Sequence, residues 1–343
     1  MGFRRDISDR IIRLHHHSEV LSDNPLGDPA ARTLLVLLPE VYEAEPERRY
    51  PVIWVLAPFT SWGARLLNLQ AWDENVAQRA VRLMGSGQMP PVLLVFPDFF
   101  TRYGGSQYLN STAVGHYEDY LINELVPYLD DHVRTIPDRD CRALLGYSSG
   151  GYGALVHGMR HSDIFGAVAA HSGDLFFDTC YRPDIPAAVR ALESFGGLGA
   201  FLSSLDSTER IERGSAWYAA LNLVAMSACY SPNPDSPFGF DLPFDTYTGE
   251  IIPSIWERWL ALDPISMTEL HARELHTLNA LFFDCGNADE FNLFLGARLL
   301  HRKLESLGIP HTYEEFDGGH RNINWRFDTS LRLLGKALAD QTG

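Results

Sequence analysis

The chain has 343 residues, 45% of them apolar and 21% charged, which is ordinary for a soluble globular protein and enough for a sizeable core. Its formal net charge of −16 argues against nucleic acid or an anionic membrane as the main partner and favours a small neutral or cationic ligand. The sequence does not fix the oligomeric state, and a homo-oligomer is compatible with it.

The N-terminal twenty residues contain arginines but no apolar run, so no secretory signal is predicted there. The longest apolar runs, such as 34–38 and 92–96, have the length of a strand and fall far short of a membrane span. The four cysteines lie far apart without a Cys-x-x-Cys pair, which indicates neither a zinc site nor a disulfide framework. A cytoplasmic protein is therefore expected.

Short apolar runs alternate with helical patterns through the first half of the chain, as in a mostly parallel sheet flanked by helices. Strands are predicted at 11–20, 32–38, 51–56, 91–96, 142–147 and 165–171, and helices at 69–83, 116–133 and 151–159. The alternation returns near the C-terminus, with strands at 280–284 and 311–316 and helices at 290–307 and 324–339. We expect an α/β protein of a single domain, 1–343.

The alternation stops between residues 172 and 278, a stretch rich in aromatic residues that includes a Pro/Asp/Ser/Gly-rich section at 231–244. A structureless loop of this length is rare inside a compact domain. We therefore expect 172–278 to be a mainly helical insertion that packs over the edge of the sheet as a cap. The alternative is an ordinary helical crossover with surface loops.

The strongest chemical signal is Gly146-Tyr147-Ser148-Ser149-Gly150, a Gly-x-Ser-x-Gly motif between a predicted strand and a predicted helix. Such a tight turn holds the serine hydroxyl clear of the sheet, and glycines flank it because a Cβ would meet the neighbouring backbone. The N–H groups that begin the helix favour negative charge on the reacting oxygen. Ser148 is the predicted nucleophile. Ser149 is an off-centre alternative, and its N–H is expected to serve in the oxyanion hole.

A serine nucleophile needs a base, and the base needs an orienting carboxylate; after such a motif the chain order is serine, acid, histidine. His320 lies on a Gly-Gly loop after the last predicted strand and is the predicted base. His171 is an alternative base, but its place in the chain order is wrong. Asp289, in the turn after the next-to-last predicted strand, is the predicted acid, with Asp284 and Glu290 as alternatives.

The second oxyanion donor is expected in the loop after the 51–56 strand. Pro58 has no N–H and cannot donate, so the backbone N–H of Phe59 is the candidate. The alternative is that this loop is an ordinary surface turn.

The loop after the 91–96 strand starts at the edge of the sheet where ligands bind in open α/β folds, and it is both aromatic and polar, as pocket walls often are. Its Asp98 and Arg102 are candidates for contact with substrate, although such a pair more often ties a loop down. Tyr147 and His171 are the other candidate substrate-binding residues.

These segments together resemble the Putative esterase family of α/β-hydrolases, which includes esterase D-type S-formylglutathione hydrolases, feruloyl esterases, enterochelin esterases and antigen 85-type mycolyltransferases. The matching segments are 50–53, 104–108, 146–154, 284–289 and 319–320. The resemblance implies an α/β-hydrolase fold with Ser148 as nucleophile, Asp289 as acid and His320 as base. The family usually has His-Gly or Asp-Gly where this chain has Ala57-Pro58, which argues against a mycolyltransferase substrate.

The expected function is hydrolysis of a small or medium carboxylic ester through an acyl-enzyme, without a metal or an organic cofactor. An acyltransferase would use the same three residues with an alcohol in place of water. A non-catalytic binding protein on a hydrolase scaffold is the third alternative, and the intact Ser/Asp/His set argues against it. The expected partner is a small-molecule ester, with neither nucleic acid nor a membrane.

Overall fold

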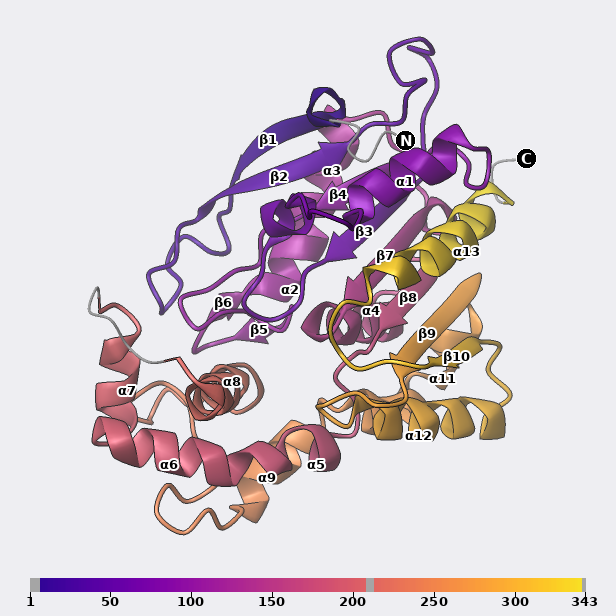
Figure 1. Ribbon diagram of the computed structural model, residues 1–343. Coiled ribbons are helices and arrows are strands. Elements are labelled where there is room, and N and C mark those ends of the chain that lie inside the picture. The colour runs from indigo at the N-terminus through magenta and orange to yellow at the C-terminus, as the bar shows by residue number, and fades with distance from the viewer. Residues whose placement is uncertain (1–6, 208–212, 341–343) are drawn as a thin grey trace.

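The centre of the molecule is an eight-stranded sheet with the strand order β1-β2-β4-β3-β7-β8-β9-β10 (Figure 1). The computed structural model describes residues 7–207 and 213–340, so residues 208–212 of the predicted insertion and the first six residues lie outside it. β2 is antiparallel to both of its neighbours, and the other six strands of this sheet, β4, β3, β7, β8, β9 and β10, run parallel to one another. The strands are β1 (Ile11–His17), β2 (Ala31–Leu37), β3 (Val52–Leu56), β4 (Leu93–Phe96), β7 (Arg142–Tyr147), β8 (Ala167–His171), β9 (Ala280–Gly286) and β10 (Thr312–Phe316).

The predicted mostly parallel α/β sheet is therefore confirmed, and its central strands are buried on both faces. Every residue of β3, β4 and β8 is buried, as expected for continuous apolar runs in a parallel sheet covered by helices. The edge strand β1 instead alternates partly buried and exposed positions, and its three histidines lie there. A short hairpin, β5 (Asn110–Ser111) and β6 (Gly115–His116), lies outside the main sheet.

Helices cover the sheet in two layers, each with its own apolar core. α1 (Val76–Gly85) and α13 (Phe327–Ala339) pack on one face. The other face carries α4 (Ser149–Arg160), α12 (Leu293–Ser306) and the helical segment formed by α2 (Tyr117–Asp119), a π-helical turn (Tyr120–Leu125) and α3 (Val126–His132). Figure 1 shows the two layers on opposite sides of the strands.

The helix starts differ from the predicted ones where a cap residue decides them. α1 begins at Val76 rather than at 69, because the Asn75 side chain accepts from the Gln78 N–H and Gln78 caps in return. α12 begins at Leu293 rather than at 290, because Asn292 is held in the left-handed region with φ 61°. α4 begins at Ser149, two residues before the predicted start.

The stretch between β8 and β9 is mainly helical, as predicted, and it contributes to the same apolar core as α4 and α12. Figure 1 shows α5, α6, α8 and α9 beyond the carboxyl ends of the parallel strands, on the side away from α1 and α13. A role of this insertion as a cap stays a prediction. Its helices are α5 (Phe177–Cys180), α6 (Ile185–Phe195), α7 (Leu198–Ser204), α8 (Ser215–Tyr230), α9 (Pro253–Leu260), α10 (Pro264–Leu270) and α11 (Ala272–His276).

Among the described residues, no helix is both long and apolar enough to cross a membrane.

Candidate active site

Ser148 occupies the turn between β7 and α4 in a strained backbone conformation, with φ 56° and ψ −126°. The two flanking glycines make this turn sterically feasible. A Cβ on Gly146 would lie 1.9 Å from the Gly150 carbonyl oxygen, and a Cβ on Gly150 would lie 2.1 Å from the Leu56 carbonyl oxygen. The Ser148 N–H donates to the His171 carbonyl oxygen at 2.9 Å, which ties the turn to β8. The local sequence thus forces the serine out of the sheet.

Three side chains form one hydrogen-bonded chain at the carboxyl ends of the strands. His320 Nε2 lies 3.0 Å from Ser148 Oγ, and His320 Nδ1 lies 2.8 Å from Asp289 Oδ2. An ionised carboxylate only accepts, so the proton of the neutral ring is on Nδ1 and the lone pair of Nε2 faces the serine. Asp289 and His320 are 3% and 6% exposed, so little water competes for these bonds. The geometry fits transfer of the Ser148 proton to His320.

The loop that carries His320 is interlocked with the end of β9. A Cβ on Gly286 would lie 2.4 Å from the Gly318 carbonyl oxygen, so only glycine allows the two segments this close. The His320 N–H donates to Glu290 Oε2 at 2.6 Å, and this hydrogen bond is the main cause that lowers the pKa of Glu290. Glu290 therefore holds the backbone of the histidine loop rather than the imidazole.

Aromatic side chains hold the His320 ring itself. The Tyr147 ring centre lies 5.0 Å from that of His320, and the Tyr147 hydroxyl donates to the His320 carbonyl oxygen at 2.5 Å. Phe291 packs edge-on against the ring, with the centres 4.8 Å apart. Tyr147 therefore positions the histidine, and its contact with substrate stays a prediction.

Asp284 and His171 belong to a different buried cluster. Asp284 Oδ1 accepts from His171 Nδ1 at 2.7 Å, and its Oδ2 accepts from Arg326 Nε at 2.6 Å. The second His171 nitrogen lies 2.8 Å from Ser330 Oγ on α13. Both ring nitrogens are occupied and the residue is 1% exposed, so the expectation that His171 contacts substrate is wrong. Asp284, the alternative acid, thus has both oxygens engaged by side chains other than His320.

Asp98 and Arg102 tie down their loop. Asp98 accepts the Phe100 N–H at 2.9 Å and lies 3.5 Å from Arg32. Arg102 pairs with Asp206 of the insertion. Their candidate role in substrate contact therefore receives no support from the structure, because both charged groups already have partners.

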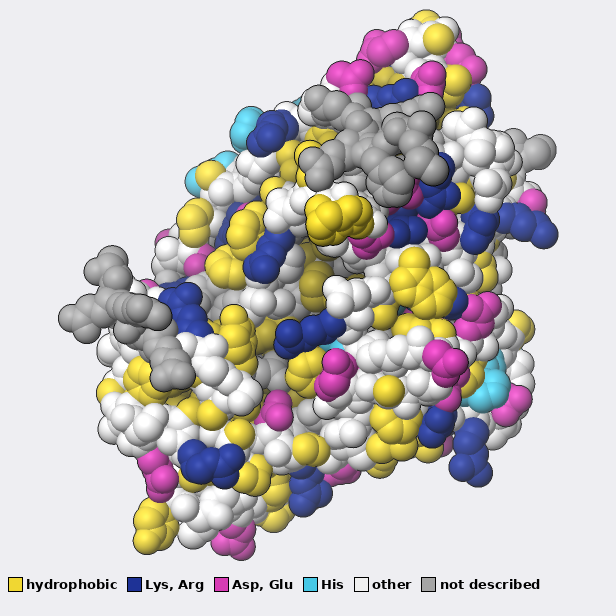
Figure 2. Space-filling view, viewed as in Figure 1, with side chains coloured by type: hydrophobic (Ala, Val, Ile, Leu, Met, Phe, Trp, Pro, Cys, Tyr) yellow, Lys and Arg dark blue, Asp and Glu magenta, His cyan; other side chains and the backbone are white. Residues whose placement is uncertain are grey.

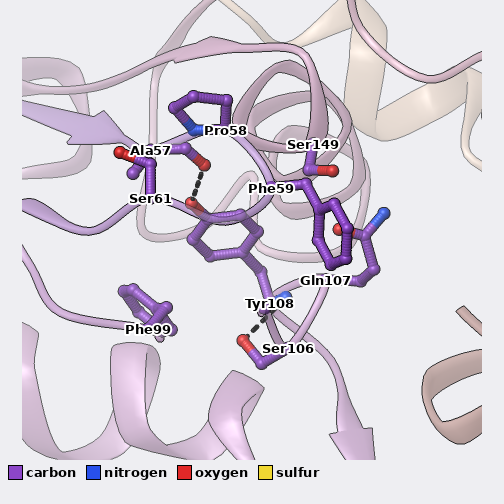
Figure 3. Close-up of a pocket in the computed structure, with 10 residues that line it drawn as sticks. Ala57, Pro58, Phe59, Ser61, Phe99, Ser106, Gln107, Tyr108 and Ser149 are labelled. Atoms are coloured by element: carbon purple, nitrogen blue, oxygen red, sulfur yellow. Dashed lines mark hydrogen bonds between the residues drawn. The ribbon is translucent and has the colours of Figure 1, made fainter. Parts of the chain in front are cut away.

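The predicted oxyanion donors line a small cavity beside the serine turn (Figure 3). Ser149 is the first residue of α4, where N–H groups have no acceptor within the helix. The Phe59 N–H likewise has no hydrogen-bond acceptor among the described residues. The loop of Phe59 is fixed by the Thr60 N–H, which donates to the Gly104 carbonyl oxygen at 2.8 Å, and by the Tyr108 hydroxyl, which donates to the Ala57 carbonyl oxygen at 2.5 Å.

Two polar side chains of this region, Asp174 and Gln107, are not among the predicted site residues. Asp174 Oδ2 accepts from Ser149 Oγ at 3.1 Å and from Gln107 Nε2 at 3.2 Å, and Gln107 lines the cavity. In Figure 3 the Ser149 hydroxyl, the Phe59 ring and the Gln107 amide gather on one side of the cavity. The position of Asp174 in the sequence could have indicated such a role, because it follows Ser-Gly directly after β8, the strand next to the serine turn. That end of the strand lies at the edge of the sheet where ligands bind.

A group of side chains with metal-ligand chemistry lies between α2 and α4. Oxygen or nitrogen atoms of Glu118, His157 and His161 lie within 4.8 Å of one another. Glu118 is already paired with His161 Nε2 at 2.8 Å and with Arg160 at 2.9 Å. Burial lowers the pKa of His157 to about 4, so this residue is neutral. The guanidinium beside Glu118 competes with a cation, and the group fits an internal ion-pair cluster.

Comparison with known proteins agrees with this architecture. The family described as "Putative esterase" matches residues 29–331. A curated relative, Esterase MT1326 of Mycobacterium tuberculosis (strain CDC 1551 / Oshkosh), is 27% identical over 291 residues, covering 83% of this chain and 51% of the relative. The chain thus spans about half the length of the curated relatives it matches.

Solved structures share the fold over nearly the whole chain. A ferulic acid esterase superposes with a TM-score of 0.62 at 21% identity and covers 96% of this chain and 98% of its own. An S-formylglutathione hydrolase from Agrobacterium tumefaciens superposes with a TM-score of 0.59 at 18% identity and covers 96% of this chain and 95% of its own. At these identities the likeness establishes the α/β-hydrolase fold.

Proposed function

Because this chain belongs to the Putative esterase family, we propose that it hydrolyses small or medium carboxylic esters through an acyl-enzyme formed on Ser148. The observation that carries the proposal is the hydrogen-bonded chain from Ser148 Oγ through His320 to Asp289, with distances of 3.0 and 2.8 Å. A serine hydroxyl is a weak nucleophile alone, and this arrangement supplies the base and the orienting carboxylate that activate it.

In the first half of the reaction, Ser148 Oγ attacks the ester carbonyl carbon while its proton moves to His320 Nε2. The imidazolium is stabilised by the Asp289 carboxylate, and it then donates the proton to the departing alcohol as the acyl-enzyme forms. In the second half, water attacks the acyl group and His320 takes and returns the proton in the same way. The acid is released and Ser148 regains its hydroxyl.

The oxyanion of each tetrahedral intermediate is proposed to be stabilised by the backbone N–H groups of Ser149 and Phe59. Two features support this pair: both donors line the cavity beside the nucleophile, and neither has an acceptor of its own among the residues that the structure describes. The start of α4 adds the positive end of a helix dipole at the same place. Removal of one such donor typically lowers kcat by roughly 10²- to 10³-fold.

Labelling with a fluorophosphonate probe, followed by peptide mass spectrometry, tests the proposal directly. We expect one labelled serine, Ser148, and loss of both label and ester hydrolysis in Ser148→Ala. Ser203→Ala is the matched control, because Ser203 is exposed on α7 and bonds only its own helix, to the Gly199 carbonyl oxygen.

The same experiment separates the alternatives. An unlabelled, inactive wild-type protein would indicate a binding protein on a hydrolase scaffold, and a label on Ser149 would move the nucleophile by one residue. Product analysis with an added alcohol acceptor would distinguish hydrolysis from acyl transfer. Transfer that outpaces hydrolysis at low acceptor concentration would contradict the assignment as a hydrolase.

A further inference from the structure

Four aspartates are buried among the described residues, and one of them differs from the other three in how its oxygens are used. Asp263 accepts backbone N–H groups on both oxygens, Asp284 pairs with His171 and Arg326, and Asp289 binds His320 and the Phe291 N–H. Asp174 takes all of its hydrogen bonds on Oδ2. Its Oδ1 has no hydrogen-bond donor within the described residues. This oxygen is nevertheless not fully enclosed, so another molecule can reach it.

The partners of Asp174 Oδ2 fix the direction of the carboxyl group. They are Ser149 Oγ at 3.1 Å, Gln107 Nε2 at 3.2 Å and the Tyr181 hydroxyl at 2.9 Å, three donors from three different segments. The Tyr230 hydroxyl accepts from Gln107 at 2.8 Å and braces the amide. Oδ1 is therefore the oxygen left for an additional partner.

This carboxyl group belongs to the active-site region. Ser149 is the residue next to the nucleophile, and Gln107 and Ser149 both line the cavity that contains the proposed oxyanion donors. Burial raises the pKa of Asp174, and His320 lies close enough for its charge to oppose that rise. Figure 2 shows that this face of the molecule is hollowed near its centre, between the insertion helices and the sheet.

The loop that carries Gln107 is held in a backbone conformation that residues other than glycine rarely adopt. Gln107 and Tyr108 have φ values of 49° and 60°, and Gln107 is 1% exposed. Strain of this kind persists only where the surrounding structure enforces it, and it collects at functional sites. The network around Asp174 is thus built into the fold rather than a chance contact of a mobile side chain.

We propose that Asp174 Oδ1 accepts a hydrogen bond from a hydroxyl or ammonium group of the ester substrate, so that the enzyme selects esters carrying such a donor close to the scissile bond. The inference rests on the proposed esterase function and names the substrate class of the same site. Asp174 would be a specificity-determining residue that touches substrate. It would take no part in the proton transfers of the triad.

The electrostatics of the site favour a donor in the substrate. Burial raises the pKa of Asp174, and its three donors are neutral groups. No lysine or arginine forms an ion pair with it in the described part of the chain. A substrate O–H or N–H that donates to Oδ1 would offset the cost of burying the charge. A methyl group at the same place would exclude water from Oδ1 and offer it no hydrogen bond.

A panel of isosteric esters tests the proposal. Ethyl glycolate, glycine ethyl ester and ethyl propanoate place a hydroxyl, an ammonium or a methyl group on the acyl side. 2-Hydroxyethyl acetate and propyl acetate make the same comparison on the alcohol side. The kcat/KM of each is measured by pH-stat near neutral pH and divided by its rate of hydroxide-catalysed hydrolysis, which removes differences in intrinsic reactivity. We expect the wild-type enzyme to prefer at least one donor ester to its methyl isostere by about 10- to 100-fold.

Asp174→Asn sharpens the test because the network fixes how the amide must sit. The Gln107 Nε2 group can only donate, so we expect the amide oxygen at the Oδ2 position. The NH₂ group then takes the place of Oδ1 and meets the substrate donor with another donor. The preference for donor esters, measured as a ratio within one enzyme, should fall to near unity. Asp263→Asn is the matched control, a buried aspartate of the same insertion whose oxygens bind backbone N–H groups, and its ratio should stay that of wild type.

The outcomes separate this inference from the proposed function. Activity on the panel with no donor preference in wild type, or with an unchanged preference in a folded Asp174→Asn, would overturn the role of Asp174 and leave the esterase proposal standing. No activity on any ester together with no fluorophosphonate label would overturn the esterase proposal itself. Should Asp174→Asn fail to fold, the corrected wild-type preference still decides.

Discussion

Replacing Asp289 by asparagine should reduce catalysis strongly while leaving the shape of the site intact. Asp289 binds through both oxygens: Oδ1 accepts the Phe291 N–H at 2.9 Å and Oδ2 faces His320 Nδ1 at 2.8 Å. In the variant, the Phe291 N–H still requires an acceptor, so the amide oxygen remains at the Oδ1 position. The NH₂ group then faces His320 Nδ1, which must accept and lose its proton.

The expected magnitude follows from that change of tautomer. With its proton moved to Nε2, His320 can no longer take the proton of Ser148, and the imidazolium also loses its counter-charge. In a serine protease with a Ser-His-Asp triad, the equivalent Asp-to-Asn change lowers kcat by about 10⁴-fold, which corresponds to about 5.4 kcal/mol in the activation free energy. Glu290 cannot substitute, because its carboxylate is engaged by the His320 N–H at 2.6 Å.

Steady-state kinetics on an activated ester near neutral pH, with thermal melts on the same preparations, measure this effect. Asp284→Asn is the matched control: it removes charge from an equally buried aspartate of the same segment, whose partners are His171 and Arg326. It should lower the melting temperature and leave kcat within a few-fold. A fully active Asp289→Asn beside a folded but inactive Asp284→Asn would refute the reasoning and transfer the acid role to Asp284.

Other consequences are equally open to measurement. Ser148→Ala and His320→Ala should each lower kcat by several powers of ten, and the double variant should be little worse, because such residues act as a unit; strictly additive losses would give His320 a different role. Glu118→Gln should change acid stability: burial opposes the shift, but the His161 hydrogen bond and the Arg160 charge lower the pKa of Glu118 from 4.5 to about 2. A carboxyl with a lowered folded-state pKa stabilises the fold above its unfolded pKa and loses this effect as pH falls toward 2. The difference in urea unfolding free energy between wild type and Glu118→Gln should therefore shrink between pH 5 and pH 2, and a difference that stays constant would contradict the ion-pair account.

Features that depend on short stretches of chain could be predicted from the order of residues alone. Continuous apolar runs identified the strands of the parallel sheet, because a strand buried on both faces has no polar side to show. The serine turn was equally local, since Gly146 and Gly150 are the residues whose Cβ atoms would collide with backbone. The loss of strand–helix alternation marked the insertion between β8 and β9, although helix starts were decided by cap residues such as Asn75 and Asn292.

Contacts between side chains that lie far apart in the sequence could not be predicted in the same way. Asp284 and His171 lie opposite each other in the register of β8 and β9, and both point to the α13 face, away from Ser148. Asp289 reaches His320 because Gly286 lets the end of β9 and the histidine loop interlock. Asp174 meets Gln107 across 67 positions of sequence. The side of the sheet that a strand residue faces, and the loop it meets there, are set by strand pairing between distant segments, which a pattern of neighbouring residues does not encode.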